Sequence, residues 1–154
     1  MIKKNGKKNM KLPVIGFVGM SHLGLNYAVA VARKKFKVVC YDENVSTINI
    51  LNKKKSPIFE KDLEKNIKKN FSNLKFTNDL SELKKCDNVF VSQDVSTKMS
   101  GESDLKTIKN LINKTINFLN PKSNLIILCQ VPPGFTRLIN WNKGQLFYQV
   151  ETLI

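Results

Sequence analysis

The sequence predicts an α/β fold in which a doubly wound, mainly parallel sheet carries helices on both of its faces. Short apolar runs alternate along the chain with longer segments of helical periodicity, which is the pattern of consecutive βαβ units. A glycine-rich turn, Gly19–Gly24, joins the first apolar run to the first helical segment, and the second apolar run ends at Asp42. A strand, a glycine turn, a helix and a second strand ending on an acid are the layout of a Rossmann-type dinucleotide-binding unit.

Length and composition bound the kind of protein. The 154 residues fit one domain with a sizeable core, and 42% hydrophobic and 25% charged residues are ordinary for a globular chain. No apolar run approaches the roughly 20 residues that a membrane span needs. The three cysteines, Cys40, Cys86 and Cys129, are too far apart for a metal-ligand pattern. We therefore expect a cytoplasmic protein with buried, reduced cysteines, no metal site and no membrane segment.

The formal net charge of +14 raises the alternative of a nucleic-acid partner. Lysine supplies nearly all of the excess, because Arg33 and Arg137 are the only arginines, and the lysines are spread along the whole chain. Coding DNA rich in A and T produces such a composition without selection for a partner. Aromatic residues are not interleaved with the basic ones, as a base-stacking surface would require. The sequence therefore argues against nucleic acid as a partner, although the charge should speed the arrival of anionic ligands.

The first βαβ unit follows a basic, polar segment, residues 1–12, which we expect to be a flexible arm before a domain of residues 13–154. Residues 13–18 form a continuous apolar run, which suits a strand buried on both faces. In residues 23–35, leucine, alanine and valine recur on one helical face, and the small alanines allow close packing on a sheet. Residues 37–41 are expected to form the second strand.

The middle of the chain predicts short elements. Apolar residues recur at every third position in residues 44–52, which predicts a helix that a following Ser-Pro pair interrupts. A second helix is expected over 62–71 and a short strand over 74–77. The segment 79–82, Asp-Leu-Ser-Glu, has N-cap and capping-box spacing, so a further helix should start there.

The last part of the chain repeats the alternation. Residues 88–91 predict the fourth strand, and residues 92–103 predict a polar loop. Residues 105–119 show the clearest amphipathic helical pattern in the chain, and an Asn-Pro pair ends it. Residues 125–129 and 146–150 are the expected fifth and sixth strands.

The carboxyl ends of these strands should form one connected ligand site, because a parallel sheet places them along one edge. They carry the glycine turn, Asp42, the loop that begins at Ser92 and the turn at Gln130. The turn would hold a pyrophosphate at a helix N-terminus, and Asp42 follows at about the spacing expected for the acid that binds the adenosine ribose of NAD. Asp42 could also cap the next helix. A carboxylate on the ribose would repel the 2′-phosphate of NADP, which favours NAD.

Several blocks of the chain share a pattern with one known family. They are Ile15–Leu25, Tyr41–Asn52, Ser56–Leu63, Phe76–Leu80, Asp104–Leu105, Val131–Arg137 and Gln149–Ile154. Together they resemble the amino-terminal NAD-binding domain of the UDP-glucose/GDP-mannose dehydrogenase family, from about Val14 to the last residue. The blocks after Asp42 are more specific than the glycine turn, which many unrelated enzymes share.

The resemblance implies an NAD-dependent oxidoreductase that converts the primary alcohol of a nucleotide sugar to a carboxylate, a step toward polysaccharide precursors. In this family the catalytic cysteine and lysine lie beyond the first domain, so we expect the cofactor half of such an enzyme, as a truncated gene product or one piece of a split one. It should bind NAD, and it should act on a nucleotide sugar only if a catalytic half is supplied, with a partner chain or a homo-oligomer as the alternatives.

The resemblance and the strand-edge argument together give the candidate site residues. Glu151 matches a family position near the substrate and is the catalytic candidate. The candidate cofactor-binding residues are Gly16, Gly19, Met20, Ser21, His22, Leu23, Gly24, Asp42, Asp94, Val95, Thr97 and Gln130.

Some positions depart from the family pattern. Ser21 replaces the glycine that lets backbone approach the pyrophosphate, and its side chain could donate a hydrogen bond to a phosphate or hold the phosphate off. His22, the only histidine, stands where tyrosine is usual, and we interpret it as a hydrogen-bonding or packing group rather than a catalytic base. Val95-Ser96 and Gln130 replace a Thr-Pro pair and a threonine on the nicotinamide side. These changes indicate a divergent branch or relaxed selection, and they leave the sugar undetermined.

Two other functions stay open. A decayed or regulatory Rossmann module would keep the fold without binding a dinucleotide, and Ser21 is the residue that favours this alternative. A different NAD-dependent dehydrogenase, acting on a small hydroxy acid, is disfavoured by the blocks Pro57–Glu60 and Val131–Arg137. Titration with NADH tests the first alternative, and a substrate screen with the catalytic half added tests the second.

Overall fold

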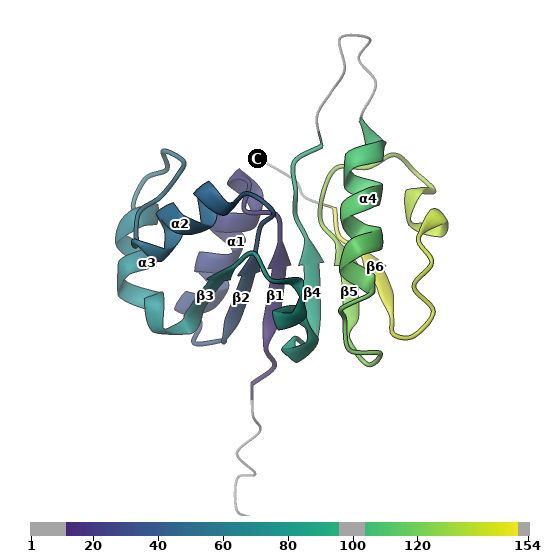
Figure 1. Ribbon diagram of the computed structural model, residues 1–154, viewed down its shortest axis with the longest axis horizontal. Coiled ribbons are helices and arrows are strands. Elements are labelled where there is room, and N and C mark those ends of the chain that lie inside the picture. Colours follow the sequence, from purple (N-terminus) through teal and green to yellow (C-terminus); the bar gives the residue numbers. More distant parts are fainter. Residues whose placement is uncertain (1–11, 96–103, 151–154) are drawn as a thin grey trace, which may run out of the picture.

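The computed structural model describes residues 12–95 and 104–150, and its six strands form one parallel sheet (Figure 1). The strands are β1 (Ile15–Val18), β2 (Val38–Tyr41), β3 (Leu74–Thr77), β4 (Asn88–Val91), β5 (Asn124–Ile127) and β6 (Leu146–Tyr148). Their order across the sheet is β3-β2-β1-β4-β5-β6, so the chain runs outward from β1 to one edge and then from β4 to the other. This confirms the doubly wound, Rossmann-type sheet that the sequence predicts.

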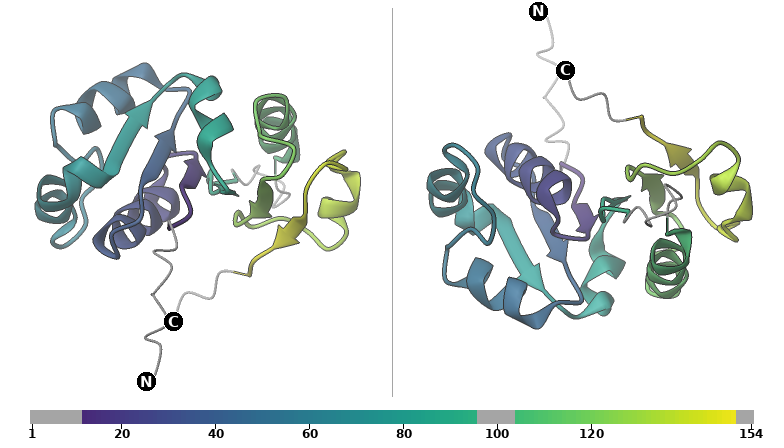
Figure 2. Two further views of the ribbon diagram at one scale, coloured as in Figure 1. Left: turned by 90° about the horizontal axis from the view of Figure 1, so that it is seen from below. Right: turned by 90° about the horizontal axis from the view of Figure 1, so that it is seen from above.

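Helices cover both faces of the sheet, and α1 and α4 lie on opposite sides of it (Figure 2). The α-helices are α1 (His22–Arg33), α2 (Val45–Asn52), α3 (Leu63–Asn70) and α4 (Leu105–Ile116). Short 3-10 helices are η1 (Phe71–Asn73), η2 (Leu80–Lys85) and η3 (Phe135–Leu138). The four α-helices lie where the sequence predicts helices, with ends displaced by at most three residues.

Alternating side chains of the central strands feed two separate cores. Phe17 of β1 is fully buried against α1 and α3, whereas its neighbour Val18 is fully buried against α4. Because successive side chains on a strand point to opposite faces, a strand that is apolar throughout requires a cover on both sides. Because β1 contributes side chains to both cores, its position is fixed on both faces of the sheet. The turn that follows β1 therefore starts from a fixed point.

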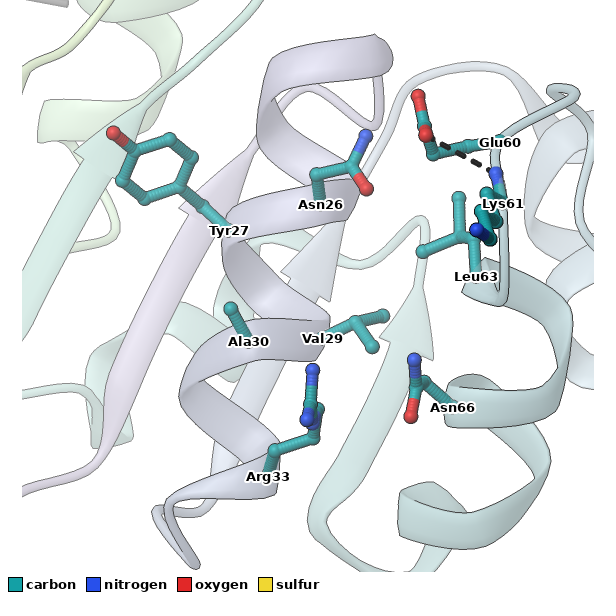
Figure 3. A pocket seen from close by; sticks show the side chains of 9 residues that line it. All are labelled: Asn26, Tyr27, Val29, Ala30, Arg33, Glu60, Lys61, Leu63 and Asn66. Atoms are coloured by element: carbon teal, nitrogen blue, oxygen red, sulfur yellow. Dashed lines mark hydrogen bonds between the residues drawn. The ribbon is translucent and has the colours of Figure 1, made fainter.

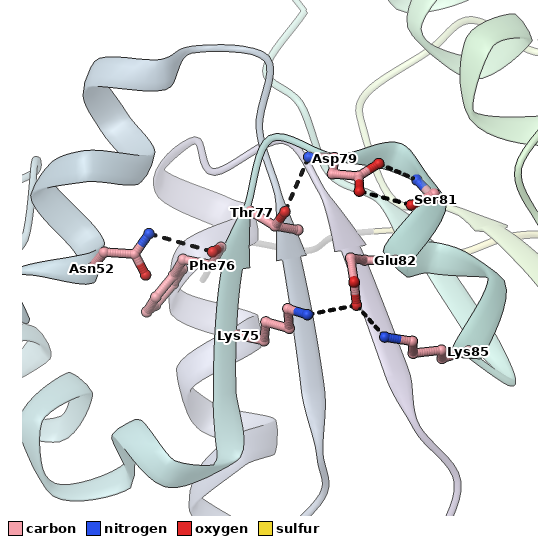
Figure 4. Close-up of polar contacts among 8 residues, drawn as sticks. All are labelled: Asn52, Lys75, Phe76, Thr77, Asp79, Ser81, Glu82 and Lys85. Atoms are coloured by element: carbon pink, nitrogen blue, oxygen red, sulfur yellow. Dashed lines mark hydrogen bonds and ion pairs between the residues drawn. The ribbon is translucent and has the colours of Figure 1, made fainter.

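The segment predicted to start a helix at Asp79 forms the 3-10 helix η2 instead of an α-helix. Asp79 caps it as expected, because its carboxylate accepts hydrogen bonds from the Ser81 N–H at 2.9 Å and the Ser81 hydroxyl at 2.8 Å (Figure 4). Glu82 does not complete the capping box. Its carboxylate instead bonds to the Nζ atoms of Lys75 at 2.7 Å and Lys85 at 2.5 Å. The Glu82 carboxylate, which a capping box would direct to the backbone N–H of Asp79, thus forms ion pairs with two lysines.

Three of the predictions concern residues outside the described ranges, and others concern the cysteines, membrane segments and metal sites. The segment 1–11, Thr97 and Glu151 lie outside the described residues. The three cysteines are buried and unpaired, as expected. Within residues 12–95 and 104–150, no helix is both long enough and apolar enough to cross a bilayer, and no cluster of histidine, cysteine and acidic side chains has the makings of a metal site.

Candidate functional site

The candidate site lies where strands β1, β2 and β4 end together. Val18, the last residue of β1, is level with Tyr41 of β2 and with Val91 of β4. The strand order changes direction between β1 and β4, and ligands of open α/β sheets bind in the crevice that such a change creates. The glycine turn therefore enters the crevice from its centre, as the sequence predicts.

Two glycines of the turn are required by close backbone contacts. Gly19 has a positive φ of 94°, and a Cβ atom there would lie 2.7 Å from the Cα of Gln93. A Cβ on Gly24 would lie 2.0 Å from the carbonyl oxygen of Gly19 and 2.4 Å from the hydroxyl of Ser92. The turn, the first turn of α1 and the end of β4 are thus packed against one another. Gly16 lies inside β1, where a side chain would press on Cys86, so its role is in the core.

The N-terminus of α1 differs from those of the other α-helices. Asn44 caps α2 and Asp104 caps α4 with side-chain oxygens, and α3 carries Glu64 in its first turn. Among the described α-helices, α1 alone has neither a side-chain cap nor an acidic residue in its first turn. Its exposed N–H groups and the positive end of its dipole are therefore available to an anion, which is the physical requirement of a pyrophosphate site.

Ser21 does not cover this helix end. Its hydroxyl donates a 2.7 Å hydrogen bond to the carbonyl oxygen of Ser92, at the end of β4. Ser92 is fully buried, and its own hydroxyl donates to the carbonyl oxygen of Gly19 at 3.0 Å. The two serines bind the turn to β4, so the hydroxyl of Ser21 is already engaged away from the first-turn N–H groups.

Asp42 binds the glycine turn to the segment that starts α2. Its Oδ2 atom accepts a 2.6 Å hydrogen bond from the N–H of Met20, and its Oδ1 atom accepts a 2.8 Å bond from the N–H of Asn44. Asn44, rather than Asp42, then caps α2 through bonds to the N–H groups of Ser46 and Thr47. The expectation that Asp42 could also cap this helix is therefore wrong, and the two predicted site residues Met20 and Asp42 are in direct contact.

Negative charge gathers around the end of β2. Burial raises the pKa of Tyr41, and the carboxylates of Glu43, Asp42 and Asp79 raise it further. A ribose with free hydroxyls can donate to such carboxylates, whereas a 2′-phosphate would be repelled. Glu43 is itself held across the crevice by a 2.8 Å ion pair with Lys114 of α4.

Two hollows meet at this edge of the sheet, and Gln93 lines both. The smaller, of about 180 Å³, lies beside the end of β2; its lining is Gly19, Tyr41, Asp42, Glu43, Asn44, Gln93, Thr107 and Leu111. The larger, of about 310 Å³, lies on the β5 side; its lining is His22, Leu23, Gln93, Asp94, Val95, Cys129 and Gln130. The structure thus brings His22, Leu23, Asp94, Val95 and Gln130 together as predicted. Gln93 escaped notice because nothing in the sequence distinguishes it from the loop around it, although its place directly after β4 could have suggested it.

The cysteines near the site are not nucleophiles. Burial raises the pKa of Cys129, which lines the larger hollow, to about 12. Burial likewise raises the pKa of Cys86 to about 12 and raises that of Cys40. A thiol needs a lowered pKa to react as a thiolate near neutral pH. All three cysteines therefore stay protonated and serve as packing groups.

His22 forms a hydrogen bond, as expected, but the sequence did not indicate its partner. It is the first residue of α1, and its Nε2 atom lies 2.8 Å from Oε2 of Glu60, in the loop before α3. Glu60 also lines a further hollow of about 340 Å³ on the outer side of α1, between α1 and the segment that leads into α3 (Figure 3). That hollow includes no residue of the glycine turn and none of the strand ends, so it is separate from the crevice.

Comparison with known proteins gives an independent finding. Residues 13–146 match the family described as "UDP-glucose/GDP-mannose dehydrogenase family, NAD binding domain". The UDP-glucose 6-dehydrogenase of Rickettsia typhi is 32% identical over 123 residues, which are 78% of this chain and 28% of that protein.

Two solved structures share the fold. A GDP-mannose dehydrogenase from Pseudomonas aeruginosa superposes with a TM-score of 0.84 at 19% identity, covering 91% of this chain and 36% of that one. A UDP-glucose dehydrogenase from Pyrobaculum islandicum gives a TM-score of 0.84 at 19% identity, covering 98% of this chain and 38% of that one. The chain thus spans well under half the length of each relative, and the match falls on the part built around the glycine turn.

Proposed function

Because the chain belongs to the UDP-glucose/GDP-mannose dehydrogenase family and is its NAD-binding domain, we propose that it holds NAD for the oxidation of a nucleotide-sugar alcohol to the acid. The observation that carries the proposal is the uncapped N-terminus of α1, which begins within the glycine turn that Asp42 contacts at the N–H of Met20. NAD, when bound, supplies the chemistry by accepting a hydride. The residues of this chain supply position and electrostatics.

Each part of the crevice suits one part of the dinucleotide. The first-turn N–H groups of α1 would bind the pyrophosphate. The absence of a side chain at Gly19 and Gly24 lets the turn pack against the end of β4 and so fixes the position of these N–H groups. Asp42 accepts one backbone N–H on each oxygen, and its remaining lone pairs would accept the hydroxyls of the adenosine ribose. The larger hollow, with Asp94, Val95 and Gln130, would receive the nicotinamide side.

This chain by itself is proposed to bind NAD without oxidising a sugar. Oxidation to the acid in this family depends on a cysteine and a lysine outside the first domain, and the three cysteines here are buried thiols with raised pKa values. A longer chain or a partner chain would have to supply the reacting groups. Unpaired cysteines also support a reducing, cytoplasmic setting.

The test is a fluorescence titration of the purified chain with NADH, with NADPH in parallel at physiological salt. Saturable binding of NADH, weaker binding of NADPH and loss of both in Asp42→Ala are expected. Asp79→Ala is the matched control, because it removes a nearby carboxylate that caps η2 but bonds to no residue of the turn. A folded chain, checked by circular dichroism, that binds no NADH contradicts the proposal. Reduction of NAD by the pure chain with UDP-glucose would contradict the absence of turnover.

The alternative of a decayed module loses its main support in the structure. Ser21 favoured it as a side chain that could hold the phosphate off, but the hydroxyl is bonded to the Ser92 carbonyl. The same titration decides between the two functions.

A further inference from the structure

The His22–Glu60 pair joins two segments that are far apart in the sequence, at the end of α1 where an anion is expected. His22 begins α1, and its Nε2 atom is 2.8 Å from the Glu60 carboxylate. The second oxygen of Glu60 accepts the N–H of Lys61 at 3.1 Å. The hydrogen bond from His22, with a smaller contribution from Lys61, lowers the pKa of Glu60. Both side chains are accessible, at 60% exposed for His22 and 39% for Glu60.

The contact between His22 and Glu60 also places a negative charge near the N-terminus of α1. The first turn of α1 contains no acidic residue, so Glu60 brings a carboxylate from another segment to a helix end that favours negative charge. His22 also lines the larger hollow of the crevice, as does Asp94 in the loop after β4. A carboxylate therefore already interacts with the side chain of the first residue of α1.

We propose that Glu60 is the resident counter-ion of His22, and that the diphosphate of the dinucleotide replaces it as the partner of the imidazolium. The inference rests on the proposed function, because it names a further binding residue of the same site. Diphosphate carries more charge than a carboxylate and would also accept hydrogen bonds from the first-turn N–H groups of α1, so the exchange favours the ligand. His22 is then a binding residue, and Glu60 opposes binding.

This arrangement predicts effects of opposite sign for the two partners of one ion pair. Removing the charge of His22 removes a charge-assisted hydrogen bond to the ligand. Removing the charge of Glu60 removes a competitor and a like charge near the diphosphate. If the pair only held the loop before α3 against α1, loss of either partner would weaken binding in the same way.

The pH dependence is assignable because the chain contains a single histidine. The charged groups around His22 are Glu60 and Lys61 in the loop before α3, Asp94 across the hollow, and Asp42, whose oxygens are engaged by Met20 and Asn44. The hydrogen bond from His22 lowers the pKa of Glu60, and histidine is the side-chain type whose ordinary pKa lies between pH 5 and pH 8. A change in NAD affinity over this interval therefore reports the proton on His22. Affinity is expected to fall as the pH rises, because the imidazolium is the form that binds diphosphate.

The experiment is isothermal titration of the full 154-residue chain with NAD at pH 6 and pH 8, for the wild type, His22→Asn and Glu60→Gln. At pH 6 we expect His22→Asn to weaken binding about fivefold and Glu60→Gln to strengthen it about threefold. Glu64→Gln is the matched control, because it removes an exposed carboxylate paired with Lys55 and Lys68 outside the crevice. Its affinity should equal that of the wild type.

Adenosine, which has no phosphate, serves as the second probe. None of the variants should change its affinity, and its binding should not depend on pH. A wild-type chain that binds neither NAD nor adenosine overturns the proposed function. A wild type that binds NAD while both variants weaken it, or while affinity is unchanged from pH 6 to pH 8, overturns this inference and leaves the NAD site in place.

Discussion

Helices α1 and α4 begin at the same edge of the sheet, on opposite faces, and each contains 12 residues. Their N-termini are used differently. The Oδ1 atom of Asp104 accepts the N–H of Lys106 at 3.1 Å and so caps α4 with a negative side chain. At the corresponding position of α1, the hydroxyl of Ser21 bonds instead to β4. One helix end is completed by its own chain, and the other is left for a ligand.

The difference shows how one type of backbone geometry serves two purposes. Every helix offers unpaired N–H groups and a partial positive charge at its N-terminus. Whether that end stabilises the fold or binds an anion depends on the residue just before the helix and on what that residue's side chain bonds to. In this protein the choice is made by Ser21 and Ser92 on one side and by Asp104 on the other.

The largest expected effect comes from a side chain placed where the glycine turn packs against the first turn of α1. Gly24→Ala places a Cβ atom 2.0 Å from the Gly19 carbonyl oxygen, so the turn and the helix must separate. We expect the free energy of unfolding to fall by about 3 kcal/mol or more, measured by urea denaturation, and NADH binding to be lost. Gly134→Ala is the control. Gly134 has a positive φ, of 85°, which Gly24 does not, and it has open space around it, so Gly134→Ala should cost about 1 kcal/mol. Equal losses for the two variants would contradict the close packing described for Gly24.

Giving α1 the cap that α4 possesses should convert one kind of helix end into the other. Ser21→Asp supplies a carboxylate that can accept first-turn N–H groups and repel diphosphate. We expect NADH affinity to fall at least about tenfold, while the free energy of unfolding stays level or rises by up to about 1 kcal/mol. Ser21→Asn, a neutral cap, should give an intermediate affinity. Unchanged NADH binding in Ser21→Asp would place the diphosphate elsewhere.

Removing the cap of α4 should lower stability and leave NADH affinity nearly unchanged, the reverse of what is expected for Ser21→Asp. Asp104→Ala leaves the N–H of Lys106 without its side-chain acceptor, so we expect the free energy of unfolding to fall by about 1 kcal/mol. NADH affinity should stay within about twofold of the wild type, because Asp104 lines neither hollow. Thermal and urea denaturation measure the first effect and the NADH titration the second. A loss of affinity larger than the loss of stability would show that the two helix ends are not independent.

The parts of this site that sequence predicted are those that local rules determine. The strand before Gly19 and the acid at Asp42 follow from hydrophobic runs and spacing, and the structure places them together as expected. The bond between Asp42 and the N–H of Met20, and the 2.8 Å contact of His22 with Glu60, depend on how separate segments are brought together by the fold. No periodicity or motif in one sequence contains that information.

The 3-10 helix after Asp79 shows the same difference between local features, which a sequence predicts, and contacts between separate segments, which it does not. The Asp-Leu-Ser-Glu pattern correctly indicates a cap at Asp79, because a cap needs only the neighbouring N–H groups. The pattern cannot indicate that Lys75, on the adjacent strand, will take the carboxylate of Glu82. Local chemistry was predictable, and competition from a residue brought near by the sheet was not.

A comparably small effect is expected for the substitution that the sequence made most prominent. Ser21→Gly restores the glycine of the family pattern, and a side chain that blocked phosphate would make this change raise NADH affinity strongly. In the structure the hydroxyl is bonded to the Ser92 carbonyl at 2.7 Å, so its removal uncovers no further N–H group of α1. We expect NADH affinity to change by less than about threefold.

The stability of the Ser21→Gly variant should be slightly lower than that of the wild type. Ser21→Gly loses one hydrogen bond and adds backbone freedom to the unfolded chain, which together lower the free energy of unfolding by about 1 kcal/mol. Ser21→Ala separates these contributions, because it removes the hydroxyl and keeps the Cβ atom. If Ser21→Gly raised affinity tenfold while Ser21→Ala did not, the Cβ atom rather than the hydroxyl would be the obstacle, and the α1 end of this chain would be less open than its missing cap suggests.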